Sequence, residues 1–196
     1  MNRTSFVILA AAFGLAGCGG RDAANRAENA VVPDNMTANA MSAANAAVAM
    51  TSGAVATLQT ANGGAAGIAR AEPADGALKI SIKVEGLPAG EHGVHVHMVG
   101  SCDAPTFASA GSHWNPTNAK HGLENPQGQH AGDMPNLSVG ADGHGTLDYT
   151  LKGGNLEGLL DADGSAIVVH AKVDDQKTDP SGNSGDRIAC GVFRKG

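Results

Sequence analysis

The stretch Leu78-Lys79-Ile80-Ser81-Ile82-Lys83-Val84 alternates apolar and polar side chains. Because successive side chains of a β-strand point to opposite faces, this alternation predicts a strand with one buried and one exposed face. Similar patterns predict six further strands, over 54–60, 66–71, 93–98, 144–151, 165–173 and 188–193. Turn-forming sequences separate these strands, among them Asn62-Gly63-Gly64, Ala141-Asp142-Gly143 and Ala162-Asp163-Gly164.

The composition agrees with a single all-β domain. The 196 residues include 28 glycines but only six aromatic side chains, which suits short strands and many turns better than a helical bundle. Seven or eight short strands between residues 53 and 196 predict a β-sandwich or β-barrel. A formal net charge of −6 provides no basic surface for a nucleic-acid backbone, so nucleic-acid binding is excluded as a function.

The N-terminal part of the chain has the features of an export signal followed by a tether. Residues 1–17 combine a basic start with an apolar run too short to span a membrane, which indicates a signal peptide. The sequence Leu15-Ala16-Gly17-Cys18 resembles a bacterial lipoprotein processing site, which implies a lipid on Cys18. A plain secretory signal with a chance cysteine is the alternative. Residues 18–52, rich in Ala and Asn, predict a flexible tether, or else a frayed helix.

These features predict the location of the protein. A lipid on Cys18 would anchor the chain in a bacterial cell envelope, with the folded domain of residues 53–196 facing the periplasm. Gly19, rather than an aspartate, follows the cysteine and favours the outer membrane.

Histidines gather in and beside residues 99–140, a stretch so long and so poor in apolar residues that it predicts a functional loop. His95 and His97 are one residue apart on a predicted strand, so both rings point to the same face and form a two-nitrogen clamp. His113, His121, His130 and Asp133 add three nitrogens and one oxygen, a set that suits tetrahedral zinc. A hydrophilic loop that binds no metal is the alternative.

Several separated motifs resemble those of copper/zinc superoxide dismutases. In chain order they are Gly93-Val94-His95-Val96-His97, Cys102, Gly111-Ser112-His113-Trp114-Asn115-Pro116, His121-Gly122, His130-Ala131-Gly132-Asp133, Val168-Val169-His170 and Gly185-Asp186-Arg187-Ile188-Ala189-Cys190-Gly191. The resemblance covers nearly all of residues 53–196. It implies an eight-stranded Greek-key β-barrel with long metal-binding loops, which agrees with the strand count.

The resemblance also implies two metals that share one ligand. The copper ligands would be His95, His97, His113 and His170, and the zinc ligands would be His113, His121, His130 and Asp133. His113 would bridge the two metals as an imidazolate. Copper can cycle between Cu(II) and Cu(I) on imidazoles, whereas zinc cannot change valence and serves geometry and charge.

Two further residues acquire roles from the resemblance. Asp174 matches a carboxylate that links a copper-bound and a zinc-bound histidine through hydrogen bonds, and an ordinary acid in the solvated run Asp174-Asp175 is the alternative. Arg187 matches the arginine at the family's active site and would attract an anionic substrate to a negatively charged protein. Lys120, Lys172 and Lys177 would assist it or serve only as solubilising lysines.

The sequence also leads to expectations for the remaining cysteines and histidines and for the single tryptophan. The resemblance implies a disulfide between Cys102 and Cys190, and two free buried thiols are the alternative. An exported protein can keep such a bridge. His92 and His144 are expected to bind no metal, and Trp114 is expected to pack the loop onto the barrel.

The function implied by the resemblance is dismutation of superoxide to dioxygen and hydrogen peroxide, with Arg187 and His113 as the catalytic residues. Such an enzyme would defend the envelope against external superoxide. A copper or zinc store or carrier on the same fold is the first alternative. A zinc hydrolase is the second, and four protein ligands without an adjacent general base argue against it. The sequence leaves a monomer and a homodimer open.

Overall fold

A computed structural model describes residues 53–196 of the chain. The predicted signal peptide 1–17, the predicted lipidation site Cys18 and the predicted tether up to residue 52 lie outside the described residues. Within residues 53–196 no helix has both the length and the apolar character needed to cross a membrane.

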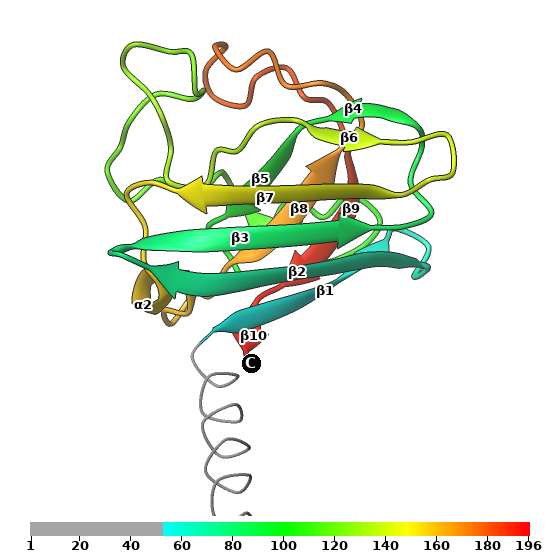
Figure 1. Cartoon of the computed structure of the whole chain (residues 1–196), viewed down its shortest axis with the longest axis horizontal. Coiled ribbons are helices and arrows are strands. Elements are labelled where there is room, and N and C mark those ends of the chain that lie inside the picture. Colours follow the sequence, from blue (N-terminus) through cyan, green and yellow to red (C-terminus); the bar gives the residue numbers. More distant parts are fainter. Residues whose placement is uncertain (1–52) are drawn as a thin grey trace, which may run out of the picture.

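The described residues form an antiparallel β-structure with two short helical turns (Figure 1). The strands are β1 (Ala54–Thr60), β2 (Ala65–Ala74), β3 (Ala77–Val84), β4 (Gly90–His92), β5 (Val94–His97), β6 (Leu137–Val139), β7 (Gly145–Leu151), β8 (Ala166–His170), β9 (Arg187–Val192) and β10 (Arg194–Lys195). The helical turns are a 3-10 helix (Ala108–Ala110) and α2 (Leu156–Leu159). The all-β class predicted from the sequence is confirmed.

The strands make one sheet that nearly closes into a barrel. Their order is β4-β6-β7-β3-β2-β1-β9-β8-β5, with β10 beside β1. The two ends of this order, β4 and β5, are joined in the chain by Gly93 alone. The Gly93 N–H donates to Lys172 O at 2.8 Å, and the His170 N–H donates to Gly93 O at 2.8 Å. These two bonds continue the pairing of β5 with β8 up to Gly93, the residue through which the chain passes from one end of the sheet to the other.

The connectivity is that of a Greek key, as predicted. β3 pairs with β7 rather than with β4, while β4, β6 and β7 pair in sequence beside them. Only Gly93 separates β4 from β5, and only Phe193 separates β9 from β10. When each of these pairs is counted as one interrupted strand, the ten strands reduce to the expected eight.

The barrel interior is filled mainly by small and branched side chains. The inward-facing residues of β3 are almost fully buried, and they are Leu78, Ile80, Ile82 and Val84. The matching positions of β1 and β2 are largely alanines. This core confirms the face assignment made from the alternating pattern of residues 78–84.

One part of the long predicted loop is a strand. β6 lies within residues 99–140, where the sequence analysis placed no strand, and that expectation was wrong for these three residues. Leu137 and Val139 are buried, and the segment pairs with β4. A three-residue alternation bounded by polar residues is too short to stand out in the sequence, and its pairing partner β4 is equally short.

Trp114 attaches the loop to the barrel, as expected. The indole is only 7% exposed and belongs to the main hydrophobic core. A Cβ atom on Gly154 would collide with Cη2 and Cζ3 of the indole, and one on Gly158 would lie 3.1 Å from its Cζ2. Trp114 therefore occupies a space that exists because positions 154 and 158 carry no side chain.

We expect Gly154→Ala to lower the free energy of unfolding by about 1–3 kcal/mol, the usual cost of overpacking a filled site. Urea unfolding followed by tryptophan fluorescence measures the change. Gly153→Asn is the matched control, because a side chain at Gly153 meets no atom within 4 Å and asparagine tolerates its φ of 82°. An unchanged urea midpoint for Gly154→Ala would show that Trp114 is not fixed by the glycines.

Candidate metal centre

Two segments of the loop pair with β5, and this brings residues that are distant in the sequence close together. His113 forms an isolated antiparallel bridge with His97, and Asp133 forms one with His95. On its other edge β5 pairs with β8, whose last residue is His170. Residues from one strand, one loop and a second strand therefore meet at the same end of the barrel.

The four predicted copper ligands form one cluster. They are all buried and are His95, His97, His113 and His170. One ligand atom from each can be chosen so that all four atoms lie within 4.8 Å of one another. Nε2 of His97 is 3.4 Å from Nε2 of His170, and Nδ1 of His95 and Nε2 of His113 are buried without a hydrogen-bond partner in the described part of the chain. Four converging imidazole nitrogens, two of them orphaned, fit a copper ion.

Hydrogen bonds on the opposite ring nitrogens orient three of these imidazoles. His97 Nδ1 donates to Gly111 O at 2.9 Å, and His170 Nδ1 donates to Gly185 O at 3.2 Å. His95 Nε2 is 2.5 Å from an oxygen of Asp174. Because a carbonyl oxygen can only accept, His97 and His170 keep their protons on Nδ1, which leaves Nε2 free to bind a metal.

The predicted zinc ligands converge on one carboxylate oxygen. Oδ1 of Asp133 lies 3.1 Å from Nδ1 of His113, 3.1 Å from Nδ1 of His121 and 3.3 Å from Nδ1 of His130. Oδ2 of Asp133 accepts hydrogen bonds from the backbone N–H groups of Gly122 and His130 at 2.8 and 3.0 Å. The backbone thus holds one oxygen and directs the other at three imidazoles, an arrangement that fits zinc.

His130 lies at the edge of this group. On this side, the residues that can each place one ligand atom within 4.8 Å of all the others are His95, His113, His121 and Asp133, and His130 is not among them. However, His95 already has its Nε2 bonded to Asp174 and its Nδ1 among the copper-side nitrogens. His130 Nδ1 is buried and makes no hydrogen bond in the described structure, so it is the better fourth zinc ligand.

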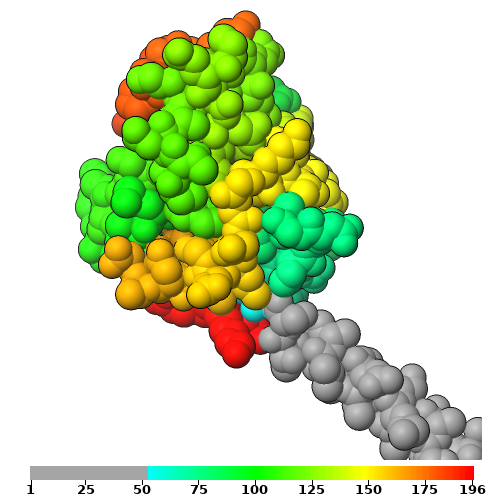
Figure 2. Space-filling view, turned by 90° about the vertical axis from the view of Figure 1, so that its left-hand side faces the viewer, coloured from blue at the N-terminus to red at the C-terminus, as the bar shows by residue number. Residues whose placement is uncertain are grey.

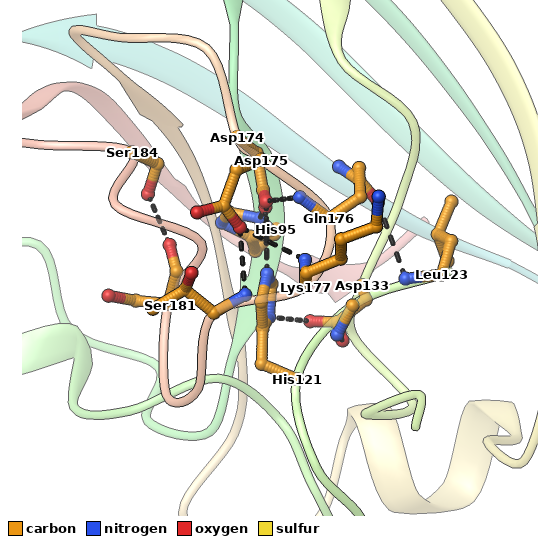
Figure 3. A network of polar contacts seen from close by, with 12 residues as sticks. His95, His121, Leu123, Asp133, Asp174, Asp175, Gln176, Lys177, Ser181 and Ser184 are labelled. Atoms are coloured by element: carbon orange, nitrogen blue, oxygen red, sulfur yellow. Dashed lines mark hydrogen bonds and ion pairs between the residues drawn. The ribbon is translucent and has the colours of Figure 1, made fainter. Parts of the chain in front are cut away.

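Asp174 joins the two clusters (Figure 3). Its carboxylate lies 2.5 Å from Nε2 of His95 and 3.0 Å from Nε2 of His121. The alternative of an ordinary solvated acid does not fit, because Asp174 is only 2% exposed. Its neighbour Asp175 is exposed and accepts from the N–H groups of Lys177 and Thr178 at 3.0 and 2.8 Å, which organises the loop outside.

The sequence analysis did not find Asn136, which positions Asp174. The Asp174 N–H donates to Asn136 Oδ1 at 2.8 Å, and Asn136 Nδ2 donates to Asp174 O at 2.9 Å. The Gln176 N–H donates to Oδ1 of Asp174 at 2.6 Å. No local motif predicts the role of Asn136, because its partner Asp174 lies 38 residues further along the chain.

Burial and hydrogen bonding set the charges of the site. Burial is the main cause that lowers the pKa of His95 to about 3 and of His170 to about 4, and it also lowers the pKa values of His97 and His113. These imidazoles are therefore neutral at neutral pH, the form that binds metal. Burial would also lower the pKa of His121, but hydrogen bonds to two carboxylates raise it to about 9.

The two carboxylates are ionised. Burial by itself would raise the pKa values of Asp133 and Asp174, but hydrogen bonds from the surrounding histidines and backbone N–H groups hold both well below the usual range. Two negative charges therefore lie among the imidazoles and complement a bound cation.

Arg187 is fixed beside the copper-side histidines. Its Nη1 and Nη2 donate to Phe107 O and Gly111 O at 2.6 and 2.7 Å. Gly111 O also accepts from His97 Nδ1, so the guanidinium lies next to a predicted copper ligand. Burial lowers the pKa of Arg187.

The predicted disulfide between Cys102 and Cys190 is present. It ties the first part of the loop to β9, the strand that begins at Arg187. The loop segment that supplies the carbonyl acceptors for Arg187 is therefore covalently attached to the strand that carries the arginine.

The remaining candidate residues lie as follows. Lys120 pairs with Asp179 at 3.0 Å, and Lys177 pairs with Glu124 at 2.7 Å. His92 is buried, and its ring nitrogens contact His170 O at 2.8 Å and Pro88 O at 2.9 Å, which suits a structural histidine. His144 is exposed in a turn and belongs to neither metal cluster of the described residues.

Comparisons with known proteins agree with this centre. The profile of the copper/zinc superoxide dismutase family (SODC) matches residues 62–193. A copper/zinc superoxide dismutase of Caulobacter vibrioides is 42% identical over 148 residues, which cover 72% of this chain and 85% of that protein. The superoxide dismutase-like protein YojM of Bacillus subtilis is 48% identical over 128 residues, which cover 62% of this chain and 65% of YojM.

A solved structure supports the same assignment. The crystal structure of a superoxide dismutase-like protein from Bacillus subtilis has a TM-score of 0.65 and 43% identity, and it covers 70% of this chain and 96% of that one. The chain therefore belongs to the copper/zinc superoxide dismutase family, whose named members are oxidoreductases. Copper and zinc are the family's metals, and the His-rich clusters of this chain can bind them.

Proposed function

We propose that the protein dismutates superoxide, with copper held by His95, His97, His113 and His170 and zinc held by His113, His121, His130 and Asp133. The observation that supports this most directly is the environment of His113. Its Nδ1 lies 3.1 Å from Asp133 Oδ1, its Nε2 is buried without a hydrogen-bond partner in the described residues, and His113 is a member of both clusters. One imidazole therefore faces both clusters.

Bound copper would supply the redox chemistry, taking an electron from one superoxide and giving an electron to a second. Two superoxide anions and two protons then yield one dioxygen and one hydrogen peroxide. The protein contributes the geometry, the charge and a proton route. Nε2 of His113 is the atom that can hold and deliver a proton on the copper side.

Arg187 has the task of drawing the substrate inward. The chain as a whole carries a formal charge of −6, so superoxide is repelled at long range. Lys120 and Lys177 are paired with carboxylates, whereas within residues 53–196 the guanidinium of Arg187 donates to the neutral carbonyl groups of Phe107 and Gly111. Its positive charge is therefore available to an anion beside the copper-side histidines.

We expect Arg187→Glu to lower kcat/KM for superoxide by about tenfold or more and to weaken or reverse its decrease with ionic strength. Pulse radiolysis at several salt concentrations measures both effects. Arg194→Glu makes the same charge change on exposed β10 and serves as the control. Equal rates for the two variants would show that Arg187 does not steer the substrate.

The activity itself is tested by superoxide decay with the purified full chain loaded with copper and zinc. A zinc-only sample and a cyanide-treated sample accompany it. Fast decay that requires copper and is stopped by cyanide is the expected result. Tight binding of both metals without turnover would instead identify a metal store or carrier.

We further propose that the protein is lipid-anchored through Cys18 in a bacterial envelope, faces the periplasm and defends against external superoxide. The sequence of residues 1–18 supports this location, and a structural disulfide suits an oxidising compartment. Metabolic labelling with a fatty-acid analogue should label the full chain and leave Cys18→Ser unlabelled. Equal labelling of both would contradict the anchor.

A further inference from the structure

A cavity of about 560 Å³ opens on the zinc side of the metal centre. The loop, the turn before β8 and the segment around residue 179 form its walls, and Figure 2 shows the face where the loop (green) meets the segment before β8 (yellow to orange). Its lining includes two predicted zinc ligands and four charged residues, which are His113, His130, Lys120, Asp161, Asp163 and Asp179. Arg187, His97 and His170 are not among its lining residues.

The cavity reaches two of the predicted zinc ligands. His121 and Asp133 are 0% exposed, whereas His113 and His130 are each 5% exposed and both line the cavity. His130 also has a buried Nδ1 without a hydrogen-bond partner in the described structure, and this nitrogen lies 3.3 Å from Asp133 Oδ1. The cavity thus ends at a histidine whose unpartnered nitrogen lies beside the predicted zinc ligand Asp133 and can bind a cation.

The charge of the cavity favours cations. Lys120 is neutralised by its ion pair with Asp179 at 3.0 Å. Asp161 and Asp163 are exposed and make no ion pair within residues 53–196. The cavity therefore carries an excess of negative charge, whereas the copper side carries the cationic Arg187.

We propose that this cavity is the route by which zinc enters its site, with Asp161 and Asp163 concentrating divalent cations at its mouth. The inference depends on the proposed zinc assignment. The protein then presents opposite charges on two approaches to one centre. The cation enters on the acidic side past His130, and the superoxide anion arrives on the side of Arg187.

The test is the rate at which the zinc-depleted full chain binds Co²⁺, a spectroscopic substitute for Zn²⁺ that is followed by its visible absorption. Asp161→Asn combined with Asp163→Asn removes two charges, and asparagine keeps the side-chain oxygen that accepts from the N–H groups of Asp163 and Gly164. The control removes two exposed turn charges elsewhere, through Asp75→Asn and Asp142→Asn.

We expect the association rate constant to fall by about threefold or more at low salt in the first variant, with a flatter salt dependence, and to stay near wild type in the control. Asp163→Lys should slow binding further. Equal association rates in the two double variants would overturn the proposal. A gain in superoxide kcat/KM confined to the first variant would also overturn it, because the cavity would then be the anion's path.

The same experiment separates this inference from the proposed function. Wild-type protein should bind one Co²⁺ per chain with a tetrahedral spectrum that is lost in His121→Ala. If wild type shows no such spectrum, the zinc assignment itself fails. If the spectrum is present and its rate of appearance does not depend on Asp161 and Asp163, only the entry route fails.

Discussion

Replacing His113 with alanine should reduce superoxide turnover by about a hundredfold or more while leaving part of the copper bound. The copper side keeps three buried imidazoles, His95, His97 and His170, which still form a competent set of nitrogens. The zinc side loses one of the three imidazoles directed at Asp133 Oδ1. The variant also lacks the ring whose Nε2 can deliver a proton.

Metal analysis and superoxide decay on the same preparation measure these effects. The zinc content should fall more than the copper content, because the copper set keeps three nitrogens while the zinc set keeps two nitrogens and a carboxylate. His144→Ala removes an exposed histidine outside both clusters and should leave metals and rate unchanged. Near-normal turnover in His113→Ala would contradict its shared position between the metals.

Removing the disulfide by Cys102→Ser together with Cys190→Ser should lower the free energy of unfolding by about 4.6 kcal/mol, the loop-closure value for partners so far apart. The two cysteines are 88 residues apart, so the bond constrains most of the domain in its unfolded state. The bond also fixes the segment whose carbonyl groups, at Phe107 and Gly111, hold Arg187. We therefore expect kcat/KM to fall as well.

Urea unfolding of wild type and the double serine variant, each with and without a reductant, measures the stability change. Without reductant, wild type should be the more stable by the stated amount. With the disulfide reduced, the two proteins should unfold at nearly the same urea concentration. A double variant as stable as oxidised wild type would show that noncovalent contacts alone hold the loop in place.

Much of the fold follows from local patterns in the sequence. β1 coincides with the predicted range 54–60, and the alternation over 78–84 correctly assigns the buried face of β3. Such strands are readable because a period-two pattern several residues long rarely occurs without a pleated, half-buried surface. β4 and β6 are not readable in this way, because each has only three residues and is defined by pairing with the other.

The residues of the site also fall into those that local sequence motifs predict and those that only long-range contacts define. The predicted ligands could be named because histidines and aspartates that bind metals are chemically distinctive and stand in recognisable motifs, and the structure brings them together. Asn136, Gly154 and Gly158 could not be named. An asparagine that hydrogen-bonds a distant backbone, or a glycine that makes room for an indole, has meaning only once the loop has folded onto the barrel.

The carbonyl oxygen of Gly111 accepts two hydrogen bonds, one from His97 Nδ1 and one from Arg187 Nη2. A single peptide group therefore orients a copper-side imidazole and holds the guanidinium of Arg187, the proposed attractor of the anion. Any shift of this peptide changes both at once. Under the proposed function, copper redox tuning and substrate capture would be coupled through this peptide, and a mutation in the segment before His113 that alters one should also alter the other.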